Sequence, residues 1–175
     1  MKWGEFKEAA PEIAKPAEEL LDKTGVLILG SLRKDGSPRV SPVEFVFVDG
    51  DLQLGMMPLS FKVLDLRRNP RCSIHTTVTD RMSTDGEFKA HGRAVDIQDP
   101  KIRKRYGEVL FEKIGWSPEG MDFGLFSIEL ETAAFFATEG EKRLVKRWRT
   151  GEKPHEFEQG MEGGDAGAKP ERNRQ

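Results

Sequence analysis

The sequence predicts a mostly β domain, a closed or nearly closed antiparallel barrel with peripheral helices. Six or seven segments carry the spacing of strands, and Asp-Gly turns join several of them. Two short helical segments lie between the strands. This combination of many short strands and few helices is typical of an antiparallel barrel.

Length and composition favour one globular domain with a small net charge. The chain has 175 residues, with 28 basic and 30 acidic side chains and a net charge of −2. The overall charge of the chain therefore does not favour binding to nucleic acid or to an anionic membrane. No apolar run is long enough to span a bilayer, and the N-terminus lacks the apolar region of a secretory signal. A single cysteine, Cys72, excludes an internal disulfide framework, so we expect a cytoplasmic protein.

Residues 1–23 are expected to form a helical segment beside the barrel. Apolar residues recur at helical spacing: Ile13, Ala17, Leu20 and Leu21. Pro11 and Pro16 divide the segment, so the predicted helix runs from about Pro16 to Asp22.

The barrel domain is expected over residues 24–150 and begins with an antiparallel meander. GVLILGSL is apolar on both faces and predicts a buried strand. Turns at Asp35-Gly36 and Asp49-Gly50 lead into RVSPVEFVFV and then LQLGM. Pro42 indicates a sheet edge or a bulge, because proline cannot donate to a strand ladder.

The second half of the domain alternates helices and strands. SFKVLDLRR predicts a short helix with Ser60 as N-cap, and RCSIHTTVT and EFKAHGRAVDI predict two strands. Gly92 permits a bend or a close backbone approach. Asp99 is expected to cap the helix PKIRKRYGEVLFEKI, which is followed by the strands FGLFSIELETAAFFAT and RLVKRWR. Residues 151–175 have few core-forming side chains and predict a disordered tail.

The first strand has a second apolar face that the barrel interior does not use. Leu27 and Leu29 alternate with Val26, Ile28 and Leu32. One of these faces can fill the barrel, and the other needs a helix or a second subunit. We therefore expect a homodimer.

The region between Arg33 and Arg71 predicts an anion-binding site. It contains a strand with Arg39, a methionine-rich strand end, and a helix start at Ser60-Phe61-Lys62. A helix N-terminus offers free N–H groups, and nearby cations would complete a site for a dianion. The alternative is an ordinary N-cap beside solvated basic residues.

This succession of motifs resembles the pyridoxamine 5′-phosphate oxidase-like, FMN-binding split-barrel superfamily. The likeness runs through SLRKDGSPRVSPVEF, LSFKVLDLRRNPRCSI and HGRAVDI and ends at KRWRTG, over about residues 20–151. It implies a six-stranded split barrel, a homodimer, and FMN between the subunits.

By position, the resemblance also implies a set of FMN-binding residues. Arg39, Ser60 and Lys62 would bind the flavin phosphate. Other residues would run beside or near the flavin ring: Val40, Ser41, Pro42, Met56, Met57, Thr76, Thr77 and Trp148. No catalytic residue is implied, because the flavin carries the chemistry.

Departures from the family pattern narrow the activity. Glu44 stands where the true oxidases have a lysine, Phe61 replaces a phosphate-binding arginine, and their C-terminal substrate signature is absent. We therefore expect an FMN-dependent oxidoreductase that acts on another small molecule. Two alternatives stay open: a reductase that uses the deazaflavin coenzyme F-420, and a non-catalytic carrier of flavin or haem.

The remaining polar residues predict no further site. His75, His91 and His155 lack the spacing of a metal site. Cys72 alternates with Ile74 on a strand and is expected to be a buried, inert thiol. The basic run around Trp148 fits an anionic cofactor tail better than a nucleic acid, because the chain is near neutral overall.

Overall fold

The computed structural model describes residues 1–81, 83–139 and 142–159 and confirms a mostly β, antiparallel fold. Four helices lie outside the sheet: α1 (Trp3–Ala9), α2 (Pro11–Thr24), α3 (Phe61–Arg68) and α4 (Pro100–Ile114). The strands in the first half of the chain are β1 (Val26–Leu32), β2 (Pro38–Glu44), β3 (Val46–Val48), β4 (Asp51–Met56) and β5 (Arg71–Thr76). Those in the second half are β6 (Glu87–Asp96), β7 (Gly124–Glu139), β8 (Lys142–Arg149) and β9 (His155–Gln159).

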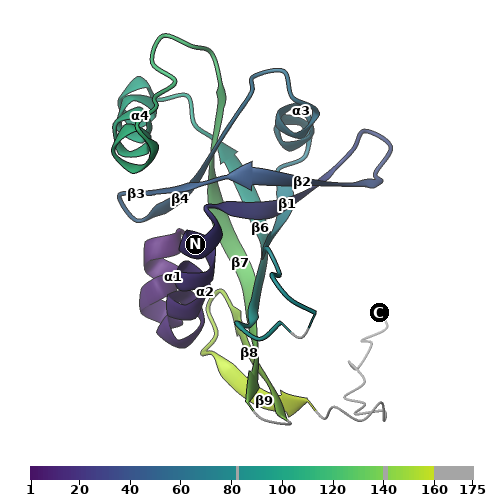
Figure 1. The fold of residues 1–175 in the computed structure, drawn as a ribbon. Helices are drawn as coiled ribbons and strands as arrows, with labels where there is room; N and C mark the ends of the chain where they lie inside the picture. Colours follow the sequence, from purple (N-terminus) through teal and green to yellow (C-terminus); the bar gives the residue numbers. More distant parts are fainter. Residues whose placement is uncertain (82, 140–141, 160–175) are drawn as a thin grey trace.

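The predicted six-stranded split barrel is confirmed. The strand order is β2-β1-β5-β6-β7-β4-β3, and Phe45 alone separates β2 from β3. This continuous run of chain pairs with β1 through β2 and with β4 through β3, which closes the barrel (Figure 1). The predicted single strand 39–48 is therefore two, because the chain changes partner at Phe45. Pro42 lies in β2, where pairing is on one side only, as expected of an edge.

A bulge at Glu131 of β7, opposite His91 and Gly92 of β6, explains the predicted role of Gly92. The pairing of β6 with β7 shifts register between His91 and Gly92. A Cβ atom at Gly92 would lie 1.9 Å from the carbonyl oxygen of Glu129, so a side chain does not fit here without displacing the backbone.

The N-terminal helices extend further than predicted. The predicted helix over Pro16–Asp22 is part of the longer α2, which contains Pro16 in its interior. Ile13, Ala17 and Leu21 are fully buried against the barrel core, while Leu20 is only partly buried. This burial outweighs the one hydrogen bond that Pro16 cannot donate.

The C-terminal prediction is wrong over residues 155–159. They form β9, which pairs with β8 from Arg147 opposite His155 to Arg143 opposite Gln159. Alternating apolar residues do not mark this strand, because Phe157 is its single apolar side chain. The rest of the predicted tail, residues 160–175, lies outside the described residues. No helix in the described ranges has the length and apolar character needed to cross a membrane.

Candidate functional site

The start of α3 has an unpaired polar group where the sequence predicts an anion site. Ser60 occupies the N-cap position with extended backbone, as predicted, and its N–H donates to the Met57 carbonyl at 3.1 Å. Its hydroxyl, however, makes no capping bond, and Oγ is buried without a partner among the described residues. Buried hydroxyls without partners are rare and costly, so this corner is prepared for a further polar group.

Arg39 is held beside this helix start by two contacts. Its Nε donates to Oδ2 of Asp65 at 2.6 Å, and its guanidinium lies 5.0 Å from the centre of the Phe61 ring. Within the described residues, its terminal N–H groups have no acceptor. Asp65 therefore occupies the Nε edge of the guanidinium and Phe61 one of its faces, and Arg39 presents its terminal N–H groups to the surface.

Asp65 and Arg68 complete the charge of the site. The Asp65 side chain is 5% exposed and also accepts a hydrogen bond from Arg68 Nη2 at 2.7 Å. Burial alone would raise the pKa of Asp65, but the hydrogen bonds from Arg39 and Arg68 outweigh it and lower that pKa. Two guanidinium groups thus surround one carboxylate, and the cluster keeps a net positive charge.

The sequence analysis did not single out Asp65 or Arg68. They follow Phe61 by four and seven residues, so all three share one face of α3. That helical spacing was the available signal, but it could not show that Arg39 of β2 would meet this face.

Large apolar side chains surround the same corner of the molecule. The most exposed of them are Val40, Met57, Leu59 and Phe61, which are 70%, 70%, 81% and 70% exposed. They lie on β2, on the β4–α3 connection and at the first residue of α3, and four such side chains are unusual for a free surface. They indicate contact with a ligand or another subunit.

A groove continues from Arg39 along the turn between β1 and β2. It has a volume of about 570 Å³ and is lined on one side by Phe61 and Leu64. Its basic lining consists of Arg33, Lys34, Arg39 and Arg68. Its two carboxylates are already engaged, since Asp65 binds the arginines and Asp35 accepts hydrogen bonds from Ser37. The groove is therefore cationic.

The other predicted residues have varied surroundings. Ser41 shares the inward row of Arg39, whereas Val40 and Pro42 face outward and are exposed. Met56 is buried in the core. Thr76 Oγ1 is bonded to the backbone of Phe88, but Thr77 Oγ1 is buried without a partner among the described residues. Lys62 is half-buried at the α3 start.

Trp148 lies apart from the α3 start, in an aromatic cluster under α1. Its side chain is 2% exposed, and its ring centre is 4.9 Å from that of Phe6. Trp3 and Phe88 continue the cluster. Figure 1 shows β8 and α3 at opposite ends of the fold. Within one chain, the structure therefore does not bring Trp148 to the predicted residues at the α3 start, Ser60 and Lys62.

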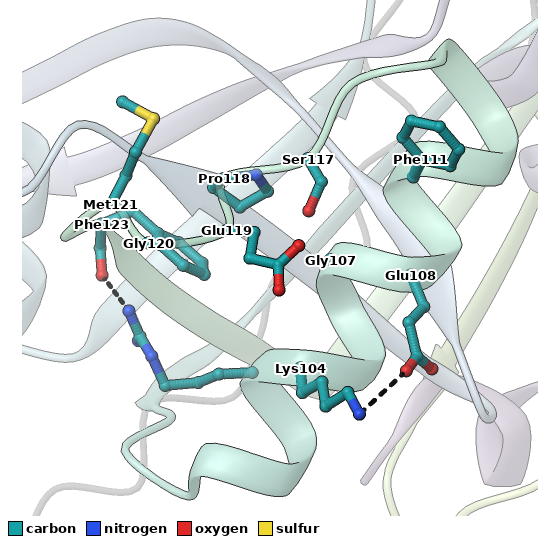
Figure 2. Close-up of a pocket in the computed structure, with 11 residues that line it drawn as sticks. Lys104, Gly107, Glu108, Phe111, Ser117, Pro118, Glu119, Gly120, Met121 and Phe123 are labelled. Atoms are coloured by element: carbon teal, nitrogen blue, oxygen red, sulfur yellow. Dashed lines mark hydrogen bonds and ion pairs between the residues drawn. The ribbon is translucent and has the colours of Figure 1, made fainter.

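A second cavity lies between α4 and residues 115–123, and none of the predicted site residues lines it (Figure 2). It has a volume of about 550 Å³. Its cations already have partners: Arg103 donates to the carbonyl oxygens of Ile97 and Phe123, and Lys104 pairs with Glu108. Arg103 therefore braces the loop after α4, and the cavity has no free cation among its described lining residues.

Cys72 is a buried thiol, as predicted. Burial, helped by the charge of Glu131, raises its pKa to about 12, so the reactive thiolate is not populated near neutral pH.

Comparison with known proteins identifies relatives of this fold. Residues 13–137 match the sequence profile of the pyridoxamine 5′-phosphate oxidase family. Among curated protein sequences, none matches significantly.

Solved structures of similar fold come from several bacteria. A Listeria innocua protein assigned as a pyridoxamine 5′-phosphate oxidase has a TM-score of 0.55 and 21% identity, over 67% of this chain and 93% of that one. General Stress Protein 26 of Bacillus anthracis has a TM-score of 0.57 and 18% identity, over 77% of this chain and 96% of that one. The heme storage protein HutZ of Vibrio cholerae has a TM-score of 0.53 and 21% identity, over 70% of this chain and 90% of that one. At these identities the likeness shows the fold alone.

Proposed function

The chain belongs to the pyridoxamine 5′-phosphate oxidase family, and on that premise we propose that it binds FMN at the α3 start and acts as a flavin-dependent oxidoreductase. The unpaired, buried hydroxyl of Ser60 carries this proposal. It lies at the N-terminus of α3, two residues before Lys62, and the guanidinium of Arg39 lies against the ring of the next residue, Phe61. A phosphate dianion supplies the acceptors that these donors lack.

The residues present fit a flavin phosphate. Ser60, Lys62 and the first N–H groups of α3 would hold the phosphate from one side, and Arg39 from the other. The exposed side chains of Val40 and Met57 offer apolar contact to a flavin ring. When bound, the flavin supplies the electron or hydride transfer, and the protein contributes position and charge.

The substrate in this proposal is a small molecule other than pyridoxamine phosphate. Glu44, which stands where the true oxidases have a lysine, is exposed at the end of β2 and places a negative charge there. Its charge is also felt by Tyr106, whose pKa is raised to about 12, first by burial and then by Glu44.

The site is proposed to lie at the boundary of a homodimer. Val40, Met57, Leu59 and Phe61 are too exposed to be covered by one chain and one flavin ring. Light scattering at micromolar concentration should give about twice the 19.8 kDa chain mass. A monomer that still binds one cofactor per chain would contradict the proposed dimer and leave the proposed phosphate site unaffected.

One observation favours the deazaflavin coenzyme as a second candidate. The cationic groove along Arg33, Lys34 and Arg68 could receive the longer anionic tail of that coenzyme. The basic run around Trp148 lies at the other end of the fold and fits this role less well.

Absorbance and binding measurements test these candidates together. The spectrum of the purified protein should show oxidised flavin, whereas a deazaflavin or haem spectrum would name another cofactor. FMN should bind more tightly than riboflavin, which lacks the phosphate. Tighter binding of the deazaflavin coenzyme that weakens strongly with salt would favour the groove, because contacts to exposed cations are screened.

A further inference from the structure

Asp65 is a buried carboxylate placed behind the proposed phosphate site. Oδ2 accepts from Arg39 Nε at 2.6 Å and from Ser31 Oγ at 3.4 Å, and Oδ1 accepts from Arg68 Nη2 at 2.7 Å. Each donor comes from a different element: β1, β2 and α3. Asp65 therefore ties the strand that carries Arg39 to the helix whose start would bind the phosphate.

The contact fixes which part of Arg39 is free. Asp65 occupies the Nε edge of the guanidinium, and the Phe61 ring lies against the group at 5.0 Å. The terminal edge has no acceptor in the described part of the chain, and two parallel N–H groups on that edge match the spacing of phosphate oxygens. A flexible arginine loses considerable rotamer freedom when it binds an anion, and one that is already fixed loses less.

The charge of Asp65 acts in the opposite direction. A carboxylate so close to the site repels an anion, and its removal should strengthen phosphate binding if charge alone mattered. Arg68 limits this repulsion because it shares the same carboxylate. Positioning and charge thus predict opposite signs for the same substitution.

We propose that Asp65 is a positioning residue that holds Arg39 in its phosphate-binding orientation, an inference that rests on the proposed function. It makes no contact with the ligand. Its contribution comes from the fixed terminal edge of Arg39, and Arg68 keeps the cluster cationic.

The decisive variant is Asp65→Asn. The loss of the charged anchor should weaken FMN binding about five- to tenfold, the scale of one hydrogen bond, and should leave riboflavin binding unchanged. Asp35→Asn is the matched control, since Asp35 lines the same groove and bonds only to Ser37 among the contacts described for it. It makes the same change in charge without releasing Arg39, so FMN binding should be unchanged or slightly tighter.

A double-mutant cycle separates positioning from a general structural effect. In an Arg39→Ala background, Asp65→Asn should not weaken FMN binding any further, and the loss of its negative charge should leave the affinity unchanged or slightly higher. Asp65→Glu keeps the charge but moves the carboxylate, and should also weaken FMN binding; it serves if the asparagine variant folds poorly.

Three results would overturn the inference: tighter FMN binding by Asp65→Asn, equal losses for FMN and riboflavin, or additive effects in the cycle. These differ from failure of the proposed function itself. If Arg39→Ala does not weaken FMN binding selectively, the phosphate site is wrong. If Arg39→Ala does so and Asp65→Asn does not, the phosphate site stands and only the role of Asp65 is lost.

Discussion

The start of α3 and the surroundings of Trp148 both contain residues expected to bind the cofactor, yet they are packed in opposite ways. Trp148 is sealed among Phe6, Trp3 and Phe88. Around the α3 start, Leu59 and Phe61 are largely exposed, and the Ser60 hydroxyl is buried without a described partner. The apolar packing around Trp148 is therefore supplied by one chain, whereas the exposed apolar side chains at the α3 start need a further molecule to cover them.

The starts of α3 and α4 differ in the same way. Asp99 caps α4, because its side chain accepts a hydrogen bond from Lys101 N at 2.8 Å. Ser60 has the same position on α3 but leaves the backbone N–H groups uncapped. The capping bond of Asp99 stabilises α4. Because Ser60 makes no such bond, the first backbone N–H groups of α3 stay available to a ligand.

The largest expected effect on folding is that of Trp148→Ala. Removal of a fully buried tryptophan should lower the free energy of unfolding by about 3–5 kcal/mol, because the aromatic cluster cannot fill the cavity. Urea unfolding measures this value. Ile114→Ala is the control, and as an exposed position outside the proposed site and dimer boundary it should stay within about 0.5 kcal/mol of the parent protein.

Trp148→Phe sharpens the comparison. It keeps an aromatic ring and removes an indole N–H that is buried without a partner among the described residues. Stability should therefore fall much less than in the alanine variant, and FMN affinity should not change. A selective loss of FMN affinity would instead support the sequence-based prediction that Trp148 approaches the flavin, from a second subunit.

The next effect concerns binding. Arg39→Ala and Lys62→Ala should each weaken FMN binding by about 1.5–3 kcal/mol, the range for hydrogen bonds to charged groups. Fluorescence titration with FMN and riboflavin measures this. Riboflavin affinity should hardly change, and equal losses for both ligands would refute the assignment of the phosphate site.

The contrast between the two regions also explains what could be predicted from sequence. Alternating apolar residues, Asp-Gly turns and Gly92 act locally, so the strands and the barrel followed from them. The contact of Arg39 with Asp65 joins β2 to α3 across 26 residues and depends on how the barrel closes. The position of Pro16 inside α2 and the pairing of β9 likewise depend on tertiary contacts that override local preference.

A smaller loss of stability is expected for Asp99→Ala. Removal of the α4 cap should cost about 1 kcal/mol in the free energy of unfolding, since one backbone N–H loses its partner. Thermal and urea unfolding measure it. FMN affinity should stay unchanged, because α4 lies away from the α3 start (Figure 1). A change in FMN affinity would show that the two helix starts are coupled.

The smallest effect on folding is expected for Ser60→Ala, although Ser60 occupies the equivalent position on α3. Its hydroxyl makes no capping bond, so the substitution removes none and takes away a buried group without a described partner. Stability should stay within about 0.5 kcal/mol of the parent protein or rise slightly. FMN affinity should nevertheless fall by about 0.5–1.5 kcal/mol, the net value of one hydrogen bond, while riboflavin affinity is kept. Urea unfolding and FMN titration of the same protein samples provide both values. A loss of stability as large as that of Asp99→Ala, without selective loss of FMN affinity, would mean that Ser60 is an ordinary cap and that the α3 start is not the phosphate site.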